Sequence, residues 1–348
     1  MAYTTVNKST DYFNTLLYTG NKTANTTISG VGFESDFTWI KSRTTTENQH
    51  AFDAVRGGGN RLYPNLSNQQ SNISTTLTSW TSDGFVTGTD DGTNANGQNF
   101  VAWNWKAGTT GSGTSSGSGT GKAYSYSVST TSGFSVVKYT GNGTAGHTIP
   151  HHLGAVPKMI IAKNLGRGEH WRVYHASLGN AHKLSLNNTT ASASASEWNS
   201  TTPTSSVFSI GTGEQINYND DNYIAYCFAE VKGFSKFGSY TGTGSTLNSP
   251  FIYTGFKPAF VIIKGSSNTE NWHMYDNKRD TFNPTDQALQ PNTNSAEFTE
   301  TNVLDFLSNG FKLRVTGGGH NGSGVSYIYM AFAEAPLVGS NNVPCTAR

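Results

Sequence analysis

The sequence has few charged residues, few methionines and only two cysteines. Charged side chains make up 13% of the 348 residues and their formal sum is +1, so no net charge attracts nucleic acid or an anionic membrane. No apolar run approaches the roughly 18 residues of a membrane-spanning helix, and residues 1–12 contain no segment typical of a secretion signal. We therefore expect a protein made in a cytoplasm, without membrane insertion and without nucleic acid as a partner.

The two cysteines lie in unlike settings, Cys227 within a predicted strand and Cys345 in a polar C-terminal segment, so no disulfide is expected. Glycine, serine, threonine and asparagine are abundant instead, with 39 glycines in the chain. This composition disfavours helices and favours short strands joined by turns. The sequence predicts an all-β protein.

Segments of the chain recur three times in the same order, which indicates an internal repeat. The sequence YTGN at 18–21 recurs at 139–142 and, as YTGT, at 240–243. The later segments of each repeat follow in register: GFESDFTWIK (32–41), LGAVPKMIIAK (153–163) and GFKPAFVIIK (255–264); HAFDAVRG (50–57), WRVYHASLG (171–179) and WHMYDNKRD (272–280); SDGFVTG (82–88), SSVFSIG (205–211) and SNGFKLR (308–314); and the closing runs QNFVAWNWKAG (98–108), DNYIAYCFAE (221–230) and VSYIYMAFAE (325–334).

The closing run of each repeat has large apolar residues at every second position. Because a strand directs alternate side chains to opposite faces, this pattern predicts a core strand with one large, packed face and one more variable face. The runs FTWIK, MIIAK and FVIIK are apolar at consecutive positions and end in Lys, as expected for central strands covered on both faces. The aligned large residues of the closing runs are Val101, Ile224 and Ile328; Trp103, Tyr226 and Met330; and Trp105, Phe228 and Phe332.

The size of each repeat and the spacing of its turns are typical of a β-sandwich. We predict three tandem, jelly-roll-like β-sandwich repeats, at 12–106, 124–230 and 231–334. Residues 107–123, AGTTGSGTSSGSGTGKA, are predicted to be a flexible Gly/Ser linker.

Three further segments complete this division of the chain. VKGF at 231–234 leaves little slack, so the second and third repeats are predicted to form a fixed pair. Residues 1–11, too polar for a core of their own, are predicted to be an N-terminal attachment segment. Residues 335–348 are predicted to be a C-terminal tail.

No set of residues typical of a catalytic centre recurs in the three repeats. The aligned position of Asp53, His175 and Asp276 is polar throughout but changes its identity. A glycosidase needs a pair of carboxyl groups flanking the substrate, and no such pair is apparent. We predict no catalytic residues and no enzymatic activity.

Two kinds of segment resemble metal sites only in composition. HTIPHH at 147–152 has three histidines, but its spacing fits no standard zinc signature. The loops 89–99 and 217–222 are rich in Asp and Asn, without the spacing of a known calcium loop, and the same residues are common in tight turns. We expect no metal and no cofactor; whether a loop binds calcium is left open.

The best candidates for a ligand or partner contact are two tryptophans at equivalent positions, each followed by a polar residue. Trp171 precedes Arg172, and Trp272 precedes His273. A tryptophan beside polar side chains can stack on a sugar ring or dock on a protein. It can equally pack at the rim of a sandwich, which is the interpretation we favour.

The repeats resemble a family of repeated β-domain proteins of tailed phages that infect marine bacteria, which are virion structural or tail-fibre proteins. The resemblance rests on YFNTLLYTGN, GVGFESDFTWIK, FDAVRG, SDGF and NFVAWNWKAG in the first repeat, and on YIAYCFAEVKGFSKFGSYTG and YIYMAFAE in the other two. It covers nearly the whole chain, apart from the Gly/Ser segment and about the last dozen residues. It implies a non-enzymatic component of a virion, synthesised in the host cytoplasm.

Two roles are open within this resemblance. A tail fibre or adhesin would form a homotrimer, bind other tail proteins and present its loops to a glycan on the host surface. A capsid decoration or head-fibre protein would bind the capsid instead. A polysaccharide-degrading spike enzyme is a third alternative, against which the lack of an acid pair argues. We expect a tail fibre or adhesin.

Overall fold

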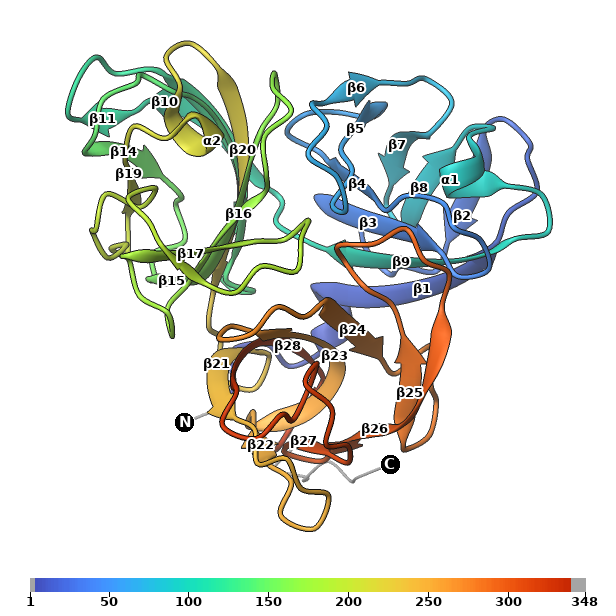
Figure 1. The fold of residues 1–348 in the computed structure, drawn as a ribbon. Helices are drawn as coiled ribbons and strands as arrows, with labels where there is room; N and C mark the ends of the chain where they lie inside the picture. Colours follow the sequence, from blue (N-terminus) through green and yellow to red (C-terminus); the bar gives the residue numbers. More distant parts are fainter. Residues whose placement is uncertain (1–3, 339–348) are drawn as a thin grey trace.

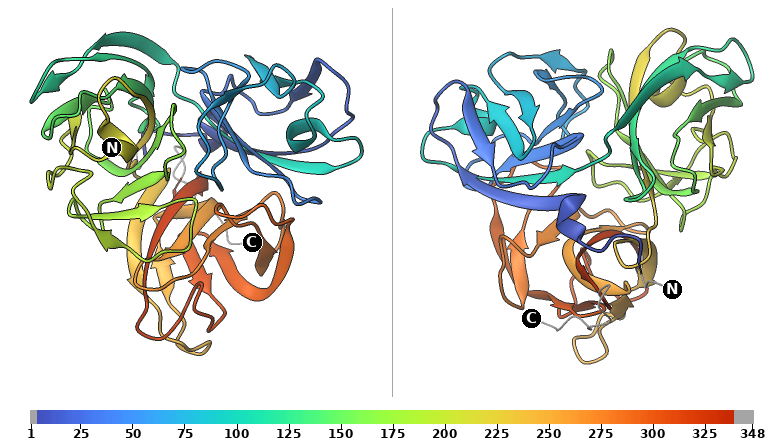
Figure 2. Two further views of the ribbon diagram at one scale, coloured as in Figure 1. Left: turned by 45° about the horizontal axis from the view of Figure 1, so that its top comes forward. Right: turned by 180° about the vertical axis from the view of Figure 1, so that it is seen from behind.

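The computed structural model describes residues 4–338, and their secondary structure is almost entirely antiparallel β-strand. The chain forms three lobes, which follow one another along the sequence and lie around a common centre (Figure 1). The two further views show the same three-lobed outline (Figure 2). The prediction of an all-β protein is confirmed.

The first lobe contains a four-stranded sheet and a three-stranded sheet. The four-stranded sheet has the order β1-β9-β3-β4, and the smaller sheet has the order β2-β8-β7. The strands are β1 (Phe13–Thr19), β2 (Thr26–Ser29), β3 (Phe37–Ser42), β4 (His50–Asp53), β7 (Leu77–Thr81), β8 (Gly84–Thr87) and β9 (Asn99–Trp105), with the short elements η1 (Ser9–Asp11), β5 (Asn60–Arg61), β6 (Ser71–Asn72) and α1 (Asp91–Asn94).

The third lobe has the same plan. Its sheets have the orders β21-β28-β23-β24 and β22-β27-β26-β25. The strands are β21 (Ser235–Thr241), β22 (Phe251–Tyr253), β23 (Phe256–Gly265), β24 (Trp272–Asp276), β25 (Thr285–Ala288), β26 (Phe298–Leu307), β27 (Gly310–Leu313) and β28 (Ser326–Pro336).

The second lobe extends this plan at both edges of its main sheet. The eight-stranded sheet has the order β10-β12-β13-β20-β15-β16-β17-β18, and β11-β14-β19 forms the small sheet. Its elements are β10 (Thr109–Thr114), β11 (Ser116–Gly117), β12 (Ala123–Ser129), β13 (Phe134–Thr140), β14 (His147–Pro150), β15 (Pro157–Asn164), β16 (Arg172–His175), β17 (His182–Ser185), β18 (Ala193–Ser194), β19 (Val207–Ile210), α2 (Glu214–Asn217) and β20 (Asn222–Ala229).

The predicted flexible linker is wrong in part, because residues 107–123 contain strands β10 and β11 and the first residue of β12. Thr109–Thr114 pairs along its whole length with β12. Gly111 and Gly113 face Tyr126 and Tyr124 across the pair, and a side chain on either glycine would meet the tyrosine ring. The aromatic rings cover the glycine backbone, which allows a Gly-rich segment to form a strand.

The two ends of the described chain pack against the rest of the protein. Within the predicted attachment segment, residues 4–11 contribute Val6 to the largest hydrophobic core, and η1 packs beside β28. The last strand, β28, runs to Pro336, beyond the predicted start of the tail at 335. Residues 339–348, including Cys345, lie outside the described residues.

The closing strands β9, β20 and β28 are buried on both faces, and in β9 and β20 the two faces belong to different cores, whereas both faces of β28 belong to the largest core. The smaller residues, such as Ala102 and Ala225, face the core within their own lobe. The large residues, such as Trp105 and Phe228, belong to one core that all three lobes share. The face predicted to be core is buried, and it joins the repeats to one another.

Candidate functional site

The tryptophans predicted as ligand contacts are buried where two repeats meet. Trp171 and Trp272 are each 1% exposed, and the neighbouring Arg172 and His273 are also buried. The indole Nε1 of Trp171 donates to the carbonyl oxygen of Tyr63 at 2.9 Å, in the first repeat. A sugar has no access to these rings, so the interpretation as an open stacking platform is wrong and rim packing describes both residues.

The same hydrogen bond occurs at all three contacts between repeats. Trp272 Nε1 donates to the Ser185 carbonyl oxygen at 3.0 Å, from the third repeat to the second. At the equivalent position in the first repeat, Gln49 Nε2 donates to the Gln290 carbonyl oxygen at 2.5 Å, in the third repeat. The contacts therefore form a closed cycle, in which the first repeat bonds to the third, the third to the second and the second to the first.

A second cycle involves the polar position that the alignment singled out. Trp103 Nε1 donates to Asp276 Oδ2 at 3.1 Å, and the Tyr226 hydroxyl donates to Asp53 Oδ2 at 2.8 Å. His175 Nε2 lies 3.2 Å from the carbonyl oxygen of Tyr329. These bonds join the same pairs of repeats as the first cycle, which explains why the position is polar although its residue changes.

Three aromatic rings meet at the centre of the shared core. The ring centroids of Trp105, Phe228 and Phe332, one from each closing strand, lie 5.8 to 6.3 Å apart in all three pairs. Aromatic pairs at this separation stabilise the folded protein beyond the contribution of burying their apolar surface. The repeats therefore resemble three subunits of a trimer that are joined in one chain.

Two of the three contacts contain a fully buried ion pair. Arg56 Nε lies 2.5 Å from Asp53 Oδ2, and Arg279 Nε lies 2.5 Å from Asp276 Oδ2. In the second repeat the equivalent pair is replaced by His175 and Leu178. Burial alone would lower the pKa of each guanidinium group, but the adjacent carboxylate raises it, so both arginines are charged.

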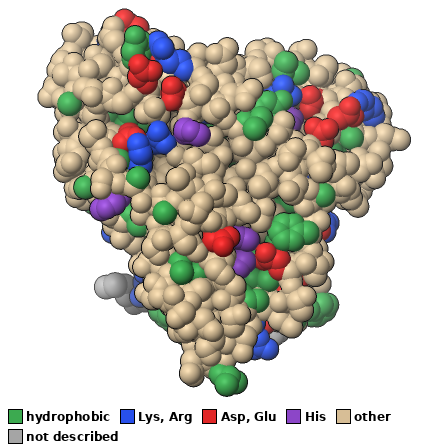
Figure 3. All heavy atoms as spheres, viewed as in Figure 1, with side chains coloured by type: hydrophobic (Ala, Val, Ile, Leu, Met, Phe, Trp, Pro, Cys, Tyr) green, Lys and Arg blue, Asp and Glu red, His purple; other side chains and the backbone are tan. Residues whose placement is uncertain are grey.

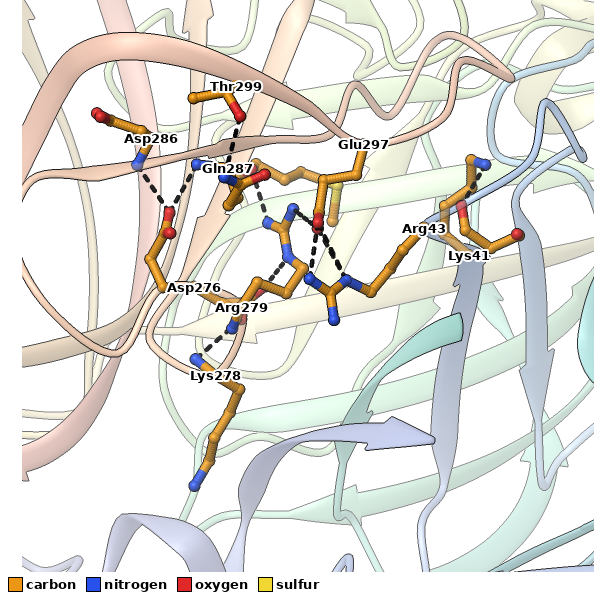
Figure 4. Close-up of polar contacts among 12 residues, drawn as sticks. Lys41, Arg43, Asp276, Lys278, Arg279, Asp286, Gln287, Glu297 and Thr299 are labelled. Carbon is orange, nitrogen blue, oxygen red and sulfur yellow. Dashed lines mark hydrogen bonds and ion pairs between the residues drawn. The ribbon is translucent and has the colours of Figure 1, made fainter. Parts of the chain in front are cut away.

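Glu297 adds a further bridge between the first and third repeats. Its carboxylate lies between the guanidinium groups of Arg43 and Arg279, at 2.7 and 3.1 Å (Figure 4). Its backbone N–H also donates to the Arg43 carbonyl oxygen at 2.8 Å. This contact thus combines buried charge with a backbone hydrogen bond.

The lysines that end the central strands are buried and bind carbonyl oxygens of the loops that follow. Lys41 Nζ donates to the carbonyl oxygens of Ser42 and Thr45, at 2.6 and 2.9 Å, and Lys163 and Lys264 make equivalent bonds. Burial lowers the pKa of Lys41 and Lys264 to about 8 and that of Lys163 to about 7. Their repetition reflects loop stabilisation.

Sequence reasoning missed an asparagine that recurs six positions before the first aromatic residue of each closing strand. Asn94, Asn217 and Asn321 precede Phe100, Tyr223 and Tyr327 by this spacing. The Oδ1 atoms accept from backbone N–H groups of the YTGN-type turns, at 2.9, 2.9 and 2.7 Å respectively. The constant spacing was visible in the sequence, but Asn is so common in this chain that one conserved position does not stand out.

A family model described as a domain of unknown function, DUF7483, matches residues 8–336. The chain belongs to this family. Because the match covers all three repeats, the DUF7483 unit is the whole three-lobed body. Comparisons with curated proteins and with solved structures give no match. None of the helices in the described part of the DUF7483 chain has the length and hydrophobicity needed to cross a bilayer.

The histidines of HTIPHH do not converge in this DUF7483 structure. His147 Nε2 bonds to the Ser115 hydroxyl at 2.7 Å, His151 Nε2 to the Thr204 carbonyl oxygen at 3.1 Å, and His152 Nε2 to the Tyr124 hydroxyl at 3.1 Å. The first Asp-rich loop, 89–99, contains α1, whose first turn is capped by the Asp90 carboxylate. These segments stabilise loops.

One group of metal-ligand type is found among residues 4–338, and it lies in the third repeat. His273, Glu300 and His320 place one potential ligand atom each within 4.8 Å of one another. His273 is the residue beside Trp272 that the sequence singled out for a different reason. His320 and Glu300 come from a loop and from β26, segments in which the repeats differ, so no repeat signal pointed to them.

Proposed function

We propose that the chain is a non-enzymatic structural protein of a phage virion, a tail fibre or adhesin that contacts a glycan on the host surface. We propose further that each repeat is a jelly-roll-like sandwich and that the three act as one rigid body. The supporting observation is an exposed aromatic pair that only the third repeat has. Capsid decoration is the alternative role.

The aromatic pair lies on the edge strand β22. Phe251 and Tyr253 are 46% and 54% exposed and point to the same side of the strand, on either side of the buried Ile252. Leu247, in the loop before β22, is 90% exposed. Apolar side chains stand out at the tip of the third lobe, away from the other two lobes (Figure 3).

The equivalent strands of the other repeats lack this pair. Ile252 pairs with Phe311 as Ile28 pairs with Phe85, which aligns β22 with β2. The first repeat then has Thr27 and Ser29 where the third has Phe251 and Tyr253. The second repeat has Thr148 and Pro150 at these positions. The other two repeats adopt the common fold without the aromatic pair, so the fold does not require it. This favours a binding role for the pair.

Neighbouring exposed rings on one side of a strand suit a sugar ring, because the apolar face of a pyranose stacks on an aromatic side chain. The loop beside them, GTGSTLNSP at 242–250, supplies hydroxyl and amide groups that can bond to sugar hydroxyls. A single stacking contact is weak, so binding would depend on several copies of the protein on one particle.

The expected homotrimer remains part of this proposal. The shared aromatic core is complete within one chain, so a trimer would have to form through the outer faces of the lobes. Light scattering of the purified protein measures its mass directly. A monomer would still be compatible with a fibre tip that binds other virion proteins.

Binding of the purified protein to host cells and to their extracted polysaccharide tests the function. We expect Phe251→Ala together with Tyr253→Ala to abolish binding without lowering the melting temperature. Phe282→Ala is the control, because Phe282 is 79% exposed in the same repeat but belongs to another loop. If the double variant still binds, Phe251 and Tyr253 do not form the glycan-binding surface.

Two further outcomes would redirect the assignment. Immunogold labelling confined to the phage head, with no binding to cells, would favour capsid decoration. Release of new reducing ends from the polysaccharide would contradict the non-enzymatic role.

A further inference from the structure

One position in the strands β4, β16 and β24, which belong to the same sheets as the closing strands, carries different chemistry in each repeat. It is occupied by His50, Arg172 and His273, each directly after the residue that bonds to the neighbouring repeat. A carboxylate approaches it every time, although from different elements. His50 Nδ1 lies 4.0 Å from Asp90, Arg172 Nε lies 3.3 Å from Glu197, and His273 Nδ1 lies 3.7 Å from Glu300.

In the first two repeats a permanent cation neutralises this carboxylate. Arg61 NH1 lies 3.2 Å from Asp90, and Lys183 Nζ lies 2.5 Å from Glu197. Arg61 and Lys183 occupy equivalent positions, because the next residues, Leu62 and Leu184, pair with equivalent residues of the preceding strand.

The third repeat lacks this cation. Leu289 pairs with Met274 as Leu62 pairs with Ala51, so the cation position is occupied by Ala288. Glu300 instead accepts a hydrogen bond from the Tyr275 hydroxyl and faces His273 and His320. The cationic side chain that neutralises this carboxylate in two repeats is thus missing from the equivalent position of the third.

Both histidines are buried, and His273 has no hydrogen-bond partner. His273 and His320 are each 4% exposed, and neither ring nitrogen of His273 bonds to any group of the protein. A buried imidazole without partners is destabilising unless something else binds it. Gly319 leaves room beside this ring, since a Cβ atom there would lie 2.9 Å from His273 Nε2.

We propose that His273, Glu300 and His320 bind a divalent transition-metal ion, and that this ion replaces the cation found in the other repeats. Two imidazoles and one carboxylate are a ligand set that Zn²⁺ and Fe²⁺ accept, with the remaining coordination positions open. The Glu300 oxygens lie 3.7 and 3.6 Å from the two ring nitrogens. Ligand atoms around tetrahedral zinc are separated by about 3.3 Å, so small side-chain rotations complete the site.

The open positions would face solvent. Glu300 and His320 line a surface cavity of about 550 Å³, together with Val303 and Arg314. This cavity provides a path of entry for a hydrated ion. Figure 3 shows histidine and acidic side chains beside one another on the third lobe.

Tyr275 orients one of the three ligands, Glu300, and contacts a second, His320. Its hydroxyl donates to Glu300 and lies 2.7 Å from His320 Nε2. A metal ion on Nε2 would replace the contact between this nitrogen and Tyr275 and would require the His320 proton to lie on Nδ1, while the tyrosine still donates to the Glu300 carboxylate. Partners of this kind fix the direction of the ligands in metal sites.

Zinc titration of chelator-treated, full-length protein tests the proposal, with calorimetry for affinity and the visible absorption of Co²⁺ as a second probe. We expect one ion per chain and a rise in melting temperature on binding. Glu300→Gln and His320→Ile should each weaken binding by at least about 100-fold. Isoleucine is the natural residue at this place in the second repeat, Ile216, which limits the effect on folding.

Two matched variants separate this site from other histidines. Ala288→Lys should abolish binding while all three ligands are kept, because it supplies the ammonium group that Lys183 supplies in the second repeat. His50→Ala, at the equivalent position of the first repeat, should leave the affinity unchanged. The proposal is overturned if the wild-type protein binds no zinc, or if binding survives both Glu300→Gln and His320→Ile.

Discussion

The first and third repeats are held together by more buried charge than the second and third, although, of these two pairs, only the second and third are adjacent in the chain. The contact between the first and third repeats contains Arg43, Glu297 and Arg279 in one network. The contact between the second and third contains His175 and a hydrogen bond from Trp272, with no equivalent Asp–Arg pair. The charged network therefore joins the two repeats that are not consecutive in the chain, where no short connection holds them close.

This difference indicates two ways of fixing the position of a repeat. A short connection such as 231–234 keeps its two repeats close, so neutral hydrogen bonds and apolar burial are sufficient to dock them. Repeats that are far apart in the sequence can meet in more than one orientation. Buried, directional ion pairs penalise the wrong orientations, because a misplaced charge would remain unpaired.

The largest effect is expected at the shared core, where the two contacts should not differ. Trp105→Ala and Phe332→Ala should each lower the free energy of unfolding by about 3–5 kcal/mol, as expected for a truncated buried aromatic residue. Because the core is common, denaturation followed by fluorescence and by circular dichroism should give one transition. Phe282→Ala, at an exposed site, should change stability by less than about 0.5 kcal/mol. Separate transitions for the repeats would contradict a shared core.

The contact between the first and third repeats should depend strongly on Asp276. Asp276→Asn leaves the buried guanidinium of Arg279 with Glu297 as its remaining carboxylate, so a loss of about 3 kcal/mol is expected. His175→Gln, the matched change at the contact between the second and third repeats, should cost about 1 kcal/mol, since a neutral bond is involved. Urea denaturation measures both. Equal losses would remove the distinction between the two contacts.

Acid should weaken the contact that contains His175. Burial lowers the pKa of His175 to about 4, whereas its pKa in the unfolded chain is about 6.5. The unfolded chain therefore binds more protons between these values, and stability falls as the pH is lowered from 6.5 to 4.

Comparison with His175→Gln isolates this residue from the other buried histidines. Between pH 6.5 and pH 4 the free energy of unfolding of the wild-type protein should fall by about 2–3 kcal/mol more than that of the variant. Unfolding free energies measured at several pH values give the difference. Parallel curves for the two proteins would show that His175 does not titrate in this range.

The smallest effect is expected for the outer part of the charged network. Arg43→Gln removes a partly exposed guanidinium from Glu297 and should cost about 1 kcal/mol, less at high salt. Lys8→Gln serves as the control, because the Lys8–Asp11 pair is far more exposed, at 70% and 50%. It should change stability by a few tenths of a kcal/mol at most. A salt-independent loss in Arg43→Gln would indicate lost packing instead of lost charge.

The sequence was sufficient to predict the core strands that recur in the three repeats and their burial. Alternation in the closing runs located Trp105, Phe228 and Phe332 on a packed face, and their burial is confirmed. Alternation cannot identify what covers a face, so the sequence placed these residues in separate sandwiches, whereas they meet in one core. The same limit applies to Trp171 and Trp272, whose partners are carbonyl groups of distant segments.

Two other features needed the tertiary structure. The Gly/Ser composition of 107–123 predicted a coil, because composition does not reveal that Tyr124 and Tyr126 cover the glycines of a neighbouring strand. The His273–Glu300–His320 group joins a strand, a second strand and a loop, with no regular spacing in the sequence. Only the fold brings such residues together.

The cyclic order of the contacts has a consequence for synthesis on the ribosome. Gln49 and Trp103 belong to the first repeat to emerge, but their acceptors, at Gln290 and Asp276, are translated last. Until then, the nascent first repeat exposes the large face of its closing strand. Partly made chains with such surfaces are prone to aggregate and are typical clients of chaperones. Folding is therefore complete only when the third repeat has been translated. A chain that terminates before it would keep this apolar face exposed and would aggregate.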